Sequence, residues 1–246
     1  TEKAMPEISF TKEKLTKKYG SADYKYEVTT NSTGKVVYRS SNTAVAEPDQ
    51  FGYITIKKAG SCTITAMVAA DANYKSASAG YQLVVSKKDM TKKKVKLSKT
   101  SYIYAGKNCK PKAVVSGLAR SDYKVTYKNA DKPGTAICVI TGKGNYSGKI
   151  EVPYSINLAK TVITKTTNKK SGVRLTWKKV AGAKGYRIYR RTKNGSWKRI
   201  GELTSGKKVS FTDKTAKSGK TYEYRVRAKR NKTYGSYSKK IKLKKK

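Results

Sequence analysis

The sequence predicts an all-β protein made of small sandwich domains in series. Short runs in which apolar and polar residues alternate are separated by turns rich in glycine and asparagine. The turns recur roughly every 8 to 12 residues, a spacing typical of antiparallel sandwiches. One strand–turn–strand unit occurs twice, from Gly60 to Val85 and again from Gly134 to Ile156, which indicates that domains of one kind are repeated along the chain.

The clearest copy of this unit is GTAICVITG at 134–142, which is followed by the turn KGNY at 143–146. In an extended backbone, Ala136, Cys138 and Ile140 lie on one side and the residues between them lie on the other. The Gly-Lys-Gly sequence at its end is not expected to bind phosphate, because it lies in a β-turn and no helix follows it.

The first domain is predicted to span residues 1–88. Its expected strands lie at 8–10, 24–28, 36–38, 51–56, 60–66 and 81–85. Three of its motifs, SSNTAVA at 40–46, GYITI at 52–56 and AGSCTITA at 59–66, resemble the bacterial immunoglobulin-like repeats of secreted Gram-positive proteins. The resemblance implies an immunoglobulin-like sandwich on a surface protein.

A charged connector, KKDMTKKK at 87–94, leads into a second predicted domain at 89–158. Its order of strands and turns resembles another small immunoglobulin-like surface module, found in large secreted proteins of gut Firmicutes. Cys109 and Cys138 stand where that pattern usually has an aliphatic residue. The two cysteines could form a disulfide across the two sheets, or remain buried as small hydrophobic residues like Cys62.

The third domain is predicted at 159–246, with strands at 173–177, 185–189, 210–213, 219–228 and 241–243. This pattern resembles the fibronectin type III domain, with Trp177 on the second strand and Tyr222 at the corner position. The resemblance implies that both residues belong to the core and that Tyr222 bonds to the upstream backbone. The chain as a whole is therefore expected to be three consecutive immunoglobulin-like β-sandwiches in a beads-on-a-string array.

The formal net charge of +42 comes from 57 basic and 15 acidic residues. From Ala159 onward there are 30 basic residues and only three acidic ones, Glu202, Asp213 and Glu223. A field of this size attracts polyanions such as nucleic acid, wall polymers, sulfated glycans or anionic membranes. Since lysine is dispersed over every domain, the charge could instead serve only solubility.

No constellation of residues for catalysis is visible. Histidine is absent, no Cys-x-x-Cys pair occurs, and the carboxylates are scattered singly. These features give no general base for neutral pH, no metal signature and no paired-carboxylate site. We therefore expect no enzyme activity, no cofactor and no metal.

The strongest candidate for a binding site is one sheet face of the third domain. Since alternate residues of a strand face opposite sides, Tyr186, Tyr222 and Tyr224 are expected to point inward and the arginine-bearing positions outward. Eight of the ten arginines of the chain lie in this domain. The outward set, with the adjoining strand included, is Arg187, Tyr189, Trp197, Arg199, Arg225, Arg227, Lys240 and Lys242, together with Glu223 and Lys229. This face could bind phosphate, sulfate or carboxylate groups, or could be a solvated face protected from aggregation by its charge.

The leading hypothesis is a noncatalytic segment, expected outside the cell or on its surface, that acts as a stalk, an adhesin or an accessory binding region. The alternatives are recognition of a host protein, such as a glycoprotein or an immunoglobulin, and binding of a glycan or an anionic wall polymer. A specific nucleic-acid partner is not expected, because no recognition helix or RNA-binding motif is visible. No apolar run approaches the roughly 20 residues that span a bilayer. A chain that begins Thr1-Glu2-Lys3 is expected to be a mature product or a piece of a longer protein.

Overall fold

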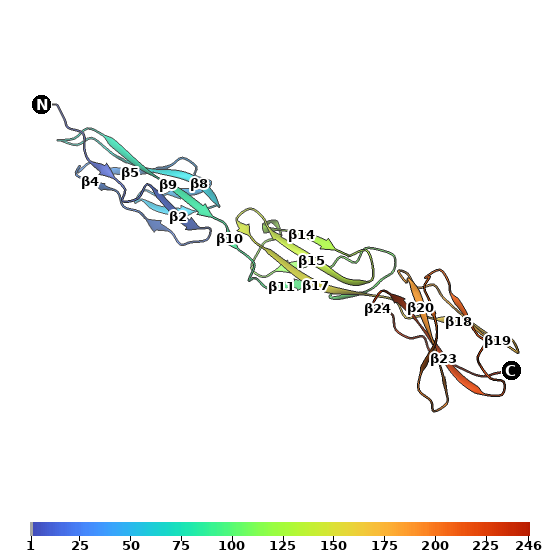
Figure 1. The fold of residues 1–246 in the computed structure, drawn as a ribbon. Coiled ribbons are helices and arrows are strands. Elements are labelled where there is room, and N and C mark those ends of the chain that lie inside the picture. The colour runs from blue at the N-terminus through green and yellow to red at the C-terminus, as the bar shows by residue number, and fades with distance from the viewer. Residues whose placement is uncertain (1) are drawn as a thin grey trace. The chain divides into compact units, whose positions relative to one another are not determined.

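The computed structural model describes residues 2–246, which form β-strands, one 3₁₀ helix, η1 (Arg120–Asp122), and no α-helix (Figure 1). The all-β class predicted from the sequence is therefore confirmed. Packing groups the chain into two compact units: Thr1–Lys94 with Val115–Lys124 and Ile140–Ile150, and Val95–Val114 with Val125–Val139 and Glu151–Lys246. The boundaries at 88 and 158 stay a prediction, because this grouping divides the segment between them.

The N-terminal sandwich lies in the first unit. Its strands are β1 (Ile8–Ser9), β2 (Lys14–Lys18), β3 (Tyr24–Lys25), β4 (Thr29–Thr30), β5 (Val36–Ser40), β6 (Ala46–Pro48), β7 (Tyr53–Ile56), β8 (Gly60–Val68) and β9 (Ala77–Ser86). One sheet has the order β2-β9-β8-β5, a second has the order β3-β7-β6, and β1 pairs with β4. The first long strand, β2, runs parallel to the last, β9, with Leu15 opposite Leu83.

Alternation determines which side chains of this sandwich reach its core. Along β8, Cys62, Ile64 and Ala66 are buried, and the residues that separate them are exposed or half-buried. Cys62 and Ile64 belong to one buried cluster with Ile54 of β7 and Leu83 of β9. The period of two read from the sequence therefore places the core correctly here.

The middle segment contains β10 (Lys88–Asp89), β11 (Val95–Leu97), β12 (Ser101–Ile103), β13 (Ala113–Val115), β14 (Tyr123–Lys128), β15 (Gly134–Gly142), β16 (Tyr146–Ser147) and β17 (Lys149–Asn157). Four of them form a sheet in the order β12-β17-β15-β14, and two further pairs are β11-β13 and β10-β16. Strand β12 runs parallel to β17, with Tyr102 opposite Ile156.

Strand β15 is the GTAICVITG stretch, and it ends in the expected turn. The Tyr146 amide donates to the Lys143 carbonyl, and a Cβ on Gly142 would lie 2.8 Å from the Tyr146 backbone, so only glycine fits there. Alternation assigns the two sides of this strand, and Val139, on the side opposite Cys138, is buried as well, at 4% exposure. Both faces of β15 are therefore covered at this point.

The disulfide considered between Cys109 and Cys138 is not formed. Both thiols are free and buried, as is that of Cys62. The Cys109 Sγ lies 3.6 Å from the Lys107 carbonyl of its own loop, and Cys138 lies in the centre of a four-stranded sheet. Burial raises the pKa of both thiols, which keeps them protonated. They act as small apolar residues, which is the alternative to a disulfide that the sequence left open.

The C-terminal sandwich lies in the second unit. Its strands are β18 (Ile163–Lys169), β19 (Gly172–Trp177), β20 (Gly185–Thr192), β21 (Lys198–Leu203), β22 (Ser210–Asp213), β23 (Thr221–Arg230), β24 (Thr233–Tyr234) and β25 (Ile241–Lys244). The order β18-β19-β22 makes one sheet, and β21-β20-β23-β24 makes the other, with β25 also paired to β23.

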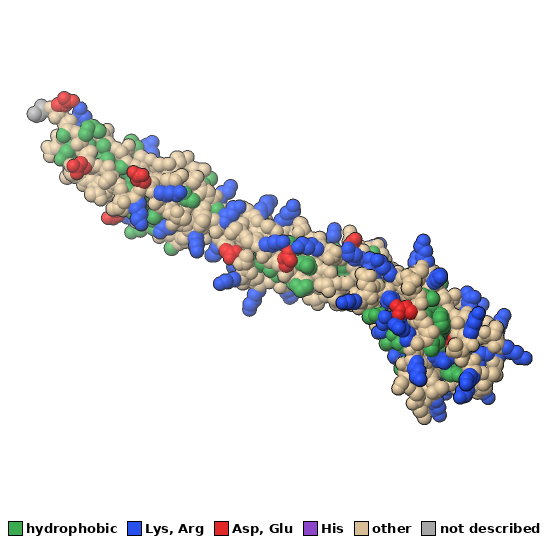
Figure 2. All heavy atoms as spheres, in the orientation of Figure 1, with side chains coloured by type: hydrophobic (Ala, Val, Ile, Leu, Met, Phe, Trp, Pro, Cys, Tyr) green, Lys and Arg blue, Asp and Glu red, His purple; other side chains and the backbone are tan. Residues whose placement is uncertain are grey.

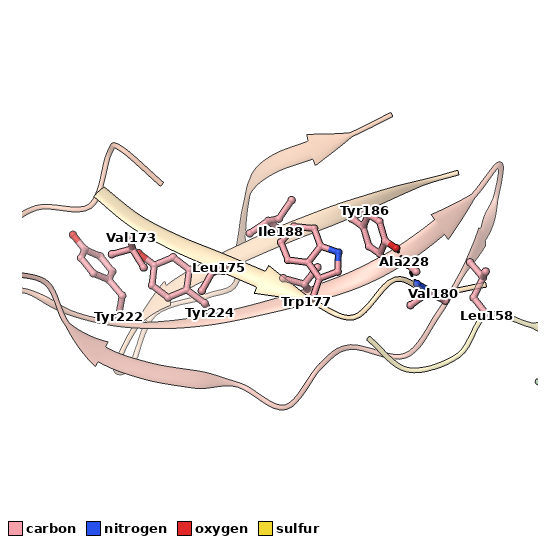
Figure 3. Packing of buried hydrophobic residues seen from close by; sticks show 11 residues of the cluster. Leu158, Val173, Leu175, Trp177, Val180, Tyr186, Ile188, Tyr222, Tyr224 and Ala228 are labelled. Atoms are coloured by element: carbon pink, nitrogen blue, oxygen red, sulfur yellow. Dashed lines mark hydrogen bonds between the residues drawn. The ribbon is translucent and has the colours of Figure 1, made fainter. Parts of the chain in front are cut away.

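Trp177 lies in the core between these sheets, where its ring is 5.1 Å from that of Tyr186 (Figure 3). The Tyr186 hydroxyl accepts a hydrogen bond from the Val180 amide. The Tyr222 hydroxyl accepts one from the Lys217 amide, five residues upstream, as the corner position implies. Core positions predicted from strand parity are thus found in the core.

Candidate functional site

Strands β20, β23 and β25 lie side by side as expected, with β21 beyond β20. Tyr189 stands opposite Arg225, and Arg187 stands opposite Arg227. Their side chains share the face that points away from Trp177 and the rest of the core. The structure therefore brings together most of the residues chosen from the sequence, although Lys240 and Lys242 are exposed at the edge strand.

Aromatic rings and guanidinium groups alternate across this face. The Arg225 guanidinium lies over the rings of Trp197, at 4.2 Å, and Tyr237, at 3.7 Å. The Arg227 guanidinium lies over Tyr237, at 4.7 Å, and Tyr234, at 4.2 Å. We call this set, with Arg187 over Tyr234 and with Tyr189, the guanidinium–aromatic ladder: Arg187, Tyr189, Trp197, Arg225, Arg227, Tyr234 and Tyr237.

The ladder changes the expectation for this face. Arg225 and Arg227 do not project as open cations, because their charged groups are stacked between rings of their own chain. The Nε atom of each is buried and has no hydrogen-bond partner. Stacking of this kind contributes about 0.5–2 kcal/mol for each contact, more as water is excluded. The ladder is thus a stabilising array, and anion binding by this face stays a prediction.

Sequence reasoning missed Tyr234 and Tyr237. The two residues lie three apart in YGSYS, at the end of β24 and in the irregular segment before β25. No strand alternation extends through that segment, so parity could not assign them a face. The rings do share one face, as their contacts with Arg227 show.

Every acidic residue of the C-terminal sandwich is held by basic ones. Glu202 accepts from Arg187 at 2.9 Å and Arg199 at 2.7 Å, and it also contacts Lys229. Glu223 accepts from Arg191 at 2.6 Å and Lys240 at 2.9 Å. The bonds from Lys229 and Arg187 lower the pKa of Glu202, and those from Lys240 and Arg191 lower the pKa of Glu223.

Asp213 is the most buried of these carboxylates, at 2% exposure. It accepts hydrogen bonds from the Tyr224 hydroxyl at 2.8 Å, from Arg190 at 2.7 Å and from Thr215. Burial alone would raise the pKa of Asp213, but the bonds from Tyr224, Thr215 and Arg190 outweigh it and hold the pKa below its usual value. Burial of the Tyr224 hydroxyl and its hydrogen bond to Asp213 raise the pKa of Tyr224.

We expect the C-terminal sandwich to lose stability in acid. A carboxylate with a depressed folded-state pKa contributes its full stability above its unfolded pKa of about 3.9, and this is lost as pH falls through the folded value. Both tryptophans of the chain lie in this sandwich, so their fluorescence reports its thermal midpoint. The thermal midpoint should fall as the pH drops below about 4. The variant Asp213→Asn should have a lower midpoint at pH 7, and its midpoint should depend less steeply on pH in acid. Equal slopes for the two proteins would contradict the role of Asp213.

No group of three or more metal-ligating side chains occurs among residues 2–246. Within the same residues, no helix is long and apolar enough to cross a membrane. Figure 2 shows lysine and arginine spread over the visible face, with a few acidic side chains between them.

The chain is similar to known proteins in two ways. A family model described as the immunoglobulin-like domain of intimin matches residues 14–71. No curated protein matches the sequence. The match falls within the predicted first domain, where the immunoglobulin-like motifs were found.

Solved structures are similar at low identity. Domains A168–A170 of titin align over 98% of both chains, with 14% identity and a TM-score of 0.30. A fibronectin type III domain from the human KIAA0970 protein aligns over 36% of this chain and 72% of its own, with 19% identity and a TM-score of 0.29. The pectate lyase PelI of Erwinia chrysanthemi aligns over 35% of this chain and 28% of its own, with 22% identity and a TM-score of 0.31. The sandwich fold of this chain follows from its own strand pairing.

Proposed function

We propose that the chain is a noncatalytic, load-bearing segment of a surface protein. The observation that carries this proposal is the parallel pairing of early and late strands. Strand β2 pairs with β9 over five residues, and β12 pairs with β17 over three. The intimin match at 14–71 supports a surface location outside the cell. Recognition of a host protein or an anionic wall polymer stays an alternative.

The parallel pairs suit a segment pulled from both ends. Tension on the chain draws an early strand toward the N-terminus and a late strand toward the C-terminus, so two parallel strands slide along each other. Their hydrogen bonds are then loaded together instead of one after another. In the C-terminal sandwich, by contrast, β18 pairs antiparallel with β19, and β25 pairs antiparallel with β23. We expect this sandwich to resist force least.

Single-molecule pulling tests the proposal. Three independent domains should give three unfolding steps of about 20 to 30 nm each, from about 0.36 nm per extended residue, with the C-terminal step at the lowest force. Two larger steps would instead indicate that the two packing units unfold as wholes. A lowest-force step from the N-terminal sandwich would contradict the load-bearing role of the parallel pairs.

A matched pair of proline variants isolates the β2–β9 contact. The Tyr19 amide donates to Ser86 and the Glu13 carbonyl accepts from Gln82. Since alternate residues of a strand face its partner, Lys17 also faces β9 and Lys18 faces away. Lys17→Pro should therefore lower the force of the N-terminal step more than Lys18→Pro does. Equal effects of the two variants would count against the proposal.

A further inference from the structure

We propose that the C-terminal sandwich carries a binding groove for a sulfated polysaccharide. The groove lies where β20 ends and β21 begins, beside the segment before β23, and has a volume of about 610 Å³. Its lining contains six basic side chains and no acidic one: Arg190, Arg191, Lys198, Arg199, Lys217 and Lys220. It is a different surface from the ladder, and it does not depend on the load-bearing role.

Two of the arginines are held in place from behind. Arg190 donates through one terminal nitrogen to Asp213, at 2.7 Å, and to Thr215, at 3.0 Å. Arg191 donates through Nε to Glu223 at 2.6 Å. Asp213 and Glu223 are 2% and 7% exposed. A guanidinium has five N–H donors, so these bonds fix each group and leave other donors for a ligand.

The lysines provide the unneutralised charge. Lys198, Lys217 and Lys220 are exposed, and none of them forms an ion pair within residues 2–246. Together with the oriented arginines they give a concave surface of one sign, which concentrates anions more than scattered surface lysines do. A second groove, of about 510 Å³ on β18, β19 and β22, has only three basic residues in its lining, Lys165, Lys169 and Arg174.

The other lining groups favour a sugar polymer over a nucleic acid. Single-stranded nucleic acids bind by stacking bases on open aromatic faces. Here the Trp197 ring is covered by Arg191 at 4.8 Å and Arg225 at 4.2 Å, and Tyr222 is 5% exposed beneath Arg190. The groove offers hydroxyl groups instead, from Thr192 and Ser196. Hydroxyl donors and acceptors beside guanidinium groups match sugar hydroxyls beside sulfate esters.

Two triple variants of equal charge test this groove. Lys198→Gln/Lys217→Gln/Lys220→Gln removes three lysines from the lining, and Lys178→Gln/Lys179→Gln/Lys184→Gln removes three exposed lysines outside it. Binding of a labelled heparin-type oligosaccharide to the full chain is measured at about 0.15 M salt, where distant charges are screened. The groove variant should bind roughly 10- to 100-fold more weakly, and the control within about 3-fold of the parent chain. Tryptophan fluorescence confirms that both variants are folded.

The remaining probes are the chemically desulfated polysaccharide, poly(glycerol phosphate) and single-stranded DNA of matched charge. Weak binding of all three supports the proposal. Equal losses of affinity in the two variants, or no binding of the sulfated probe, would overturn the assignment of the binding site to this groove. Equal binding of the desulfated polymer would overturn the role of sulfate. Tighter binding of poly(glycerol phosphate) or DNA would overturn the assignment to a sulfated polysaccharide.

Discussion

Replacing Trp177 with alanine should destabilise the C-terminal sandwich by about 3–5 kcal/mol, a large part of the stability of an ordinary domain. The side chain is 2% exposed and lies between the two sheets against Tyr186, Leu175 and Val226. Its removal leaves a cavity, and the surrounding structure relaxes only partially around such a cavity. The remaining tryptophan, Trp197, belongs to the same sandwich, so denaturant unfolding followed by its fluorescence measures the loss.

The same variant tests whether the sandwiches fold independently. The chain is rich in lysine, so trypsin should digest an unfolded C-terminal sandwich quickly. A resistant fragment ending near residue 158 should remain if the predicted third domain is separate. Trp177→Phe serves as the control, because it keeps an aromatic ring in the core and should lose less stability. Complete digestion of the alanine variant would contradict independent folding.

The fold was predictable because alternation in short strands is a strong local signal. Trp177, Tyr186 and Tyr224 each lie on a strand whose parity is unambiguous, and each is buried as expected. The sheet order β20-β23-β25 agrees with the resemblance to fibronectin type III domains. Alternation alone does not predict the burial of Val139, because packing on the second face of β15 depends on residues distant in sequence.

The site was predictable only in part. Parity placed Arg225 and Arg227 on one face, but it could not show that rings from an irregular segment would cover their charges. The groove was not predictable either. Its residues come from a strand end, a hairpin and the loop before β23, and none of these follows a simple period. The burial of the Asp213 carboxylate was likewise not predictable, because no sequence pattern distinguishes a buried acidic residue from an exposed one in a basic chain.

Replacing Arg190 with methionine should destabilise the C-terminal sandwich by about 3 kcal/mol at pH 7, near the lower end for a broken buried ion pair. Methionine keeps an apolar stem beside Tyr222 but leaves the charge of Asp213 without its guanidinium partner. The bonds from Tyr224 and Thr215 remain, which is why the upper end of that range is not expected. Urea unfolding followed by tryptophan fluorescence measures the change.

Three comparisons separate the charge of Arg190 from its packing. The double variant Arg190→Met/Asp213→Asn should be more stable than the sum of the single losses predicts, because no unpaired carboxylate remains. Without Arg190 the pKa of Asp213 rises toward the value set by burial, so the deficit should shrink as pH falls and the carboxylate takes up a proton. Arg191→Met should cost less, because Glu223 retains Lys240. A deficit for Arg190→Met that is the same at pH 7 and pH 3 would instead assign the role of Arg190 to its contact with Tyr222.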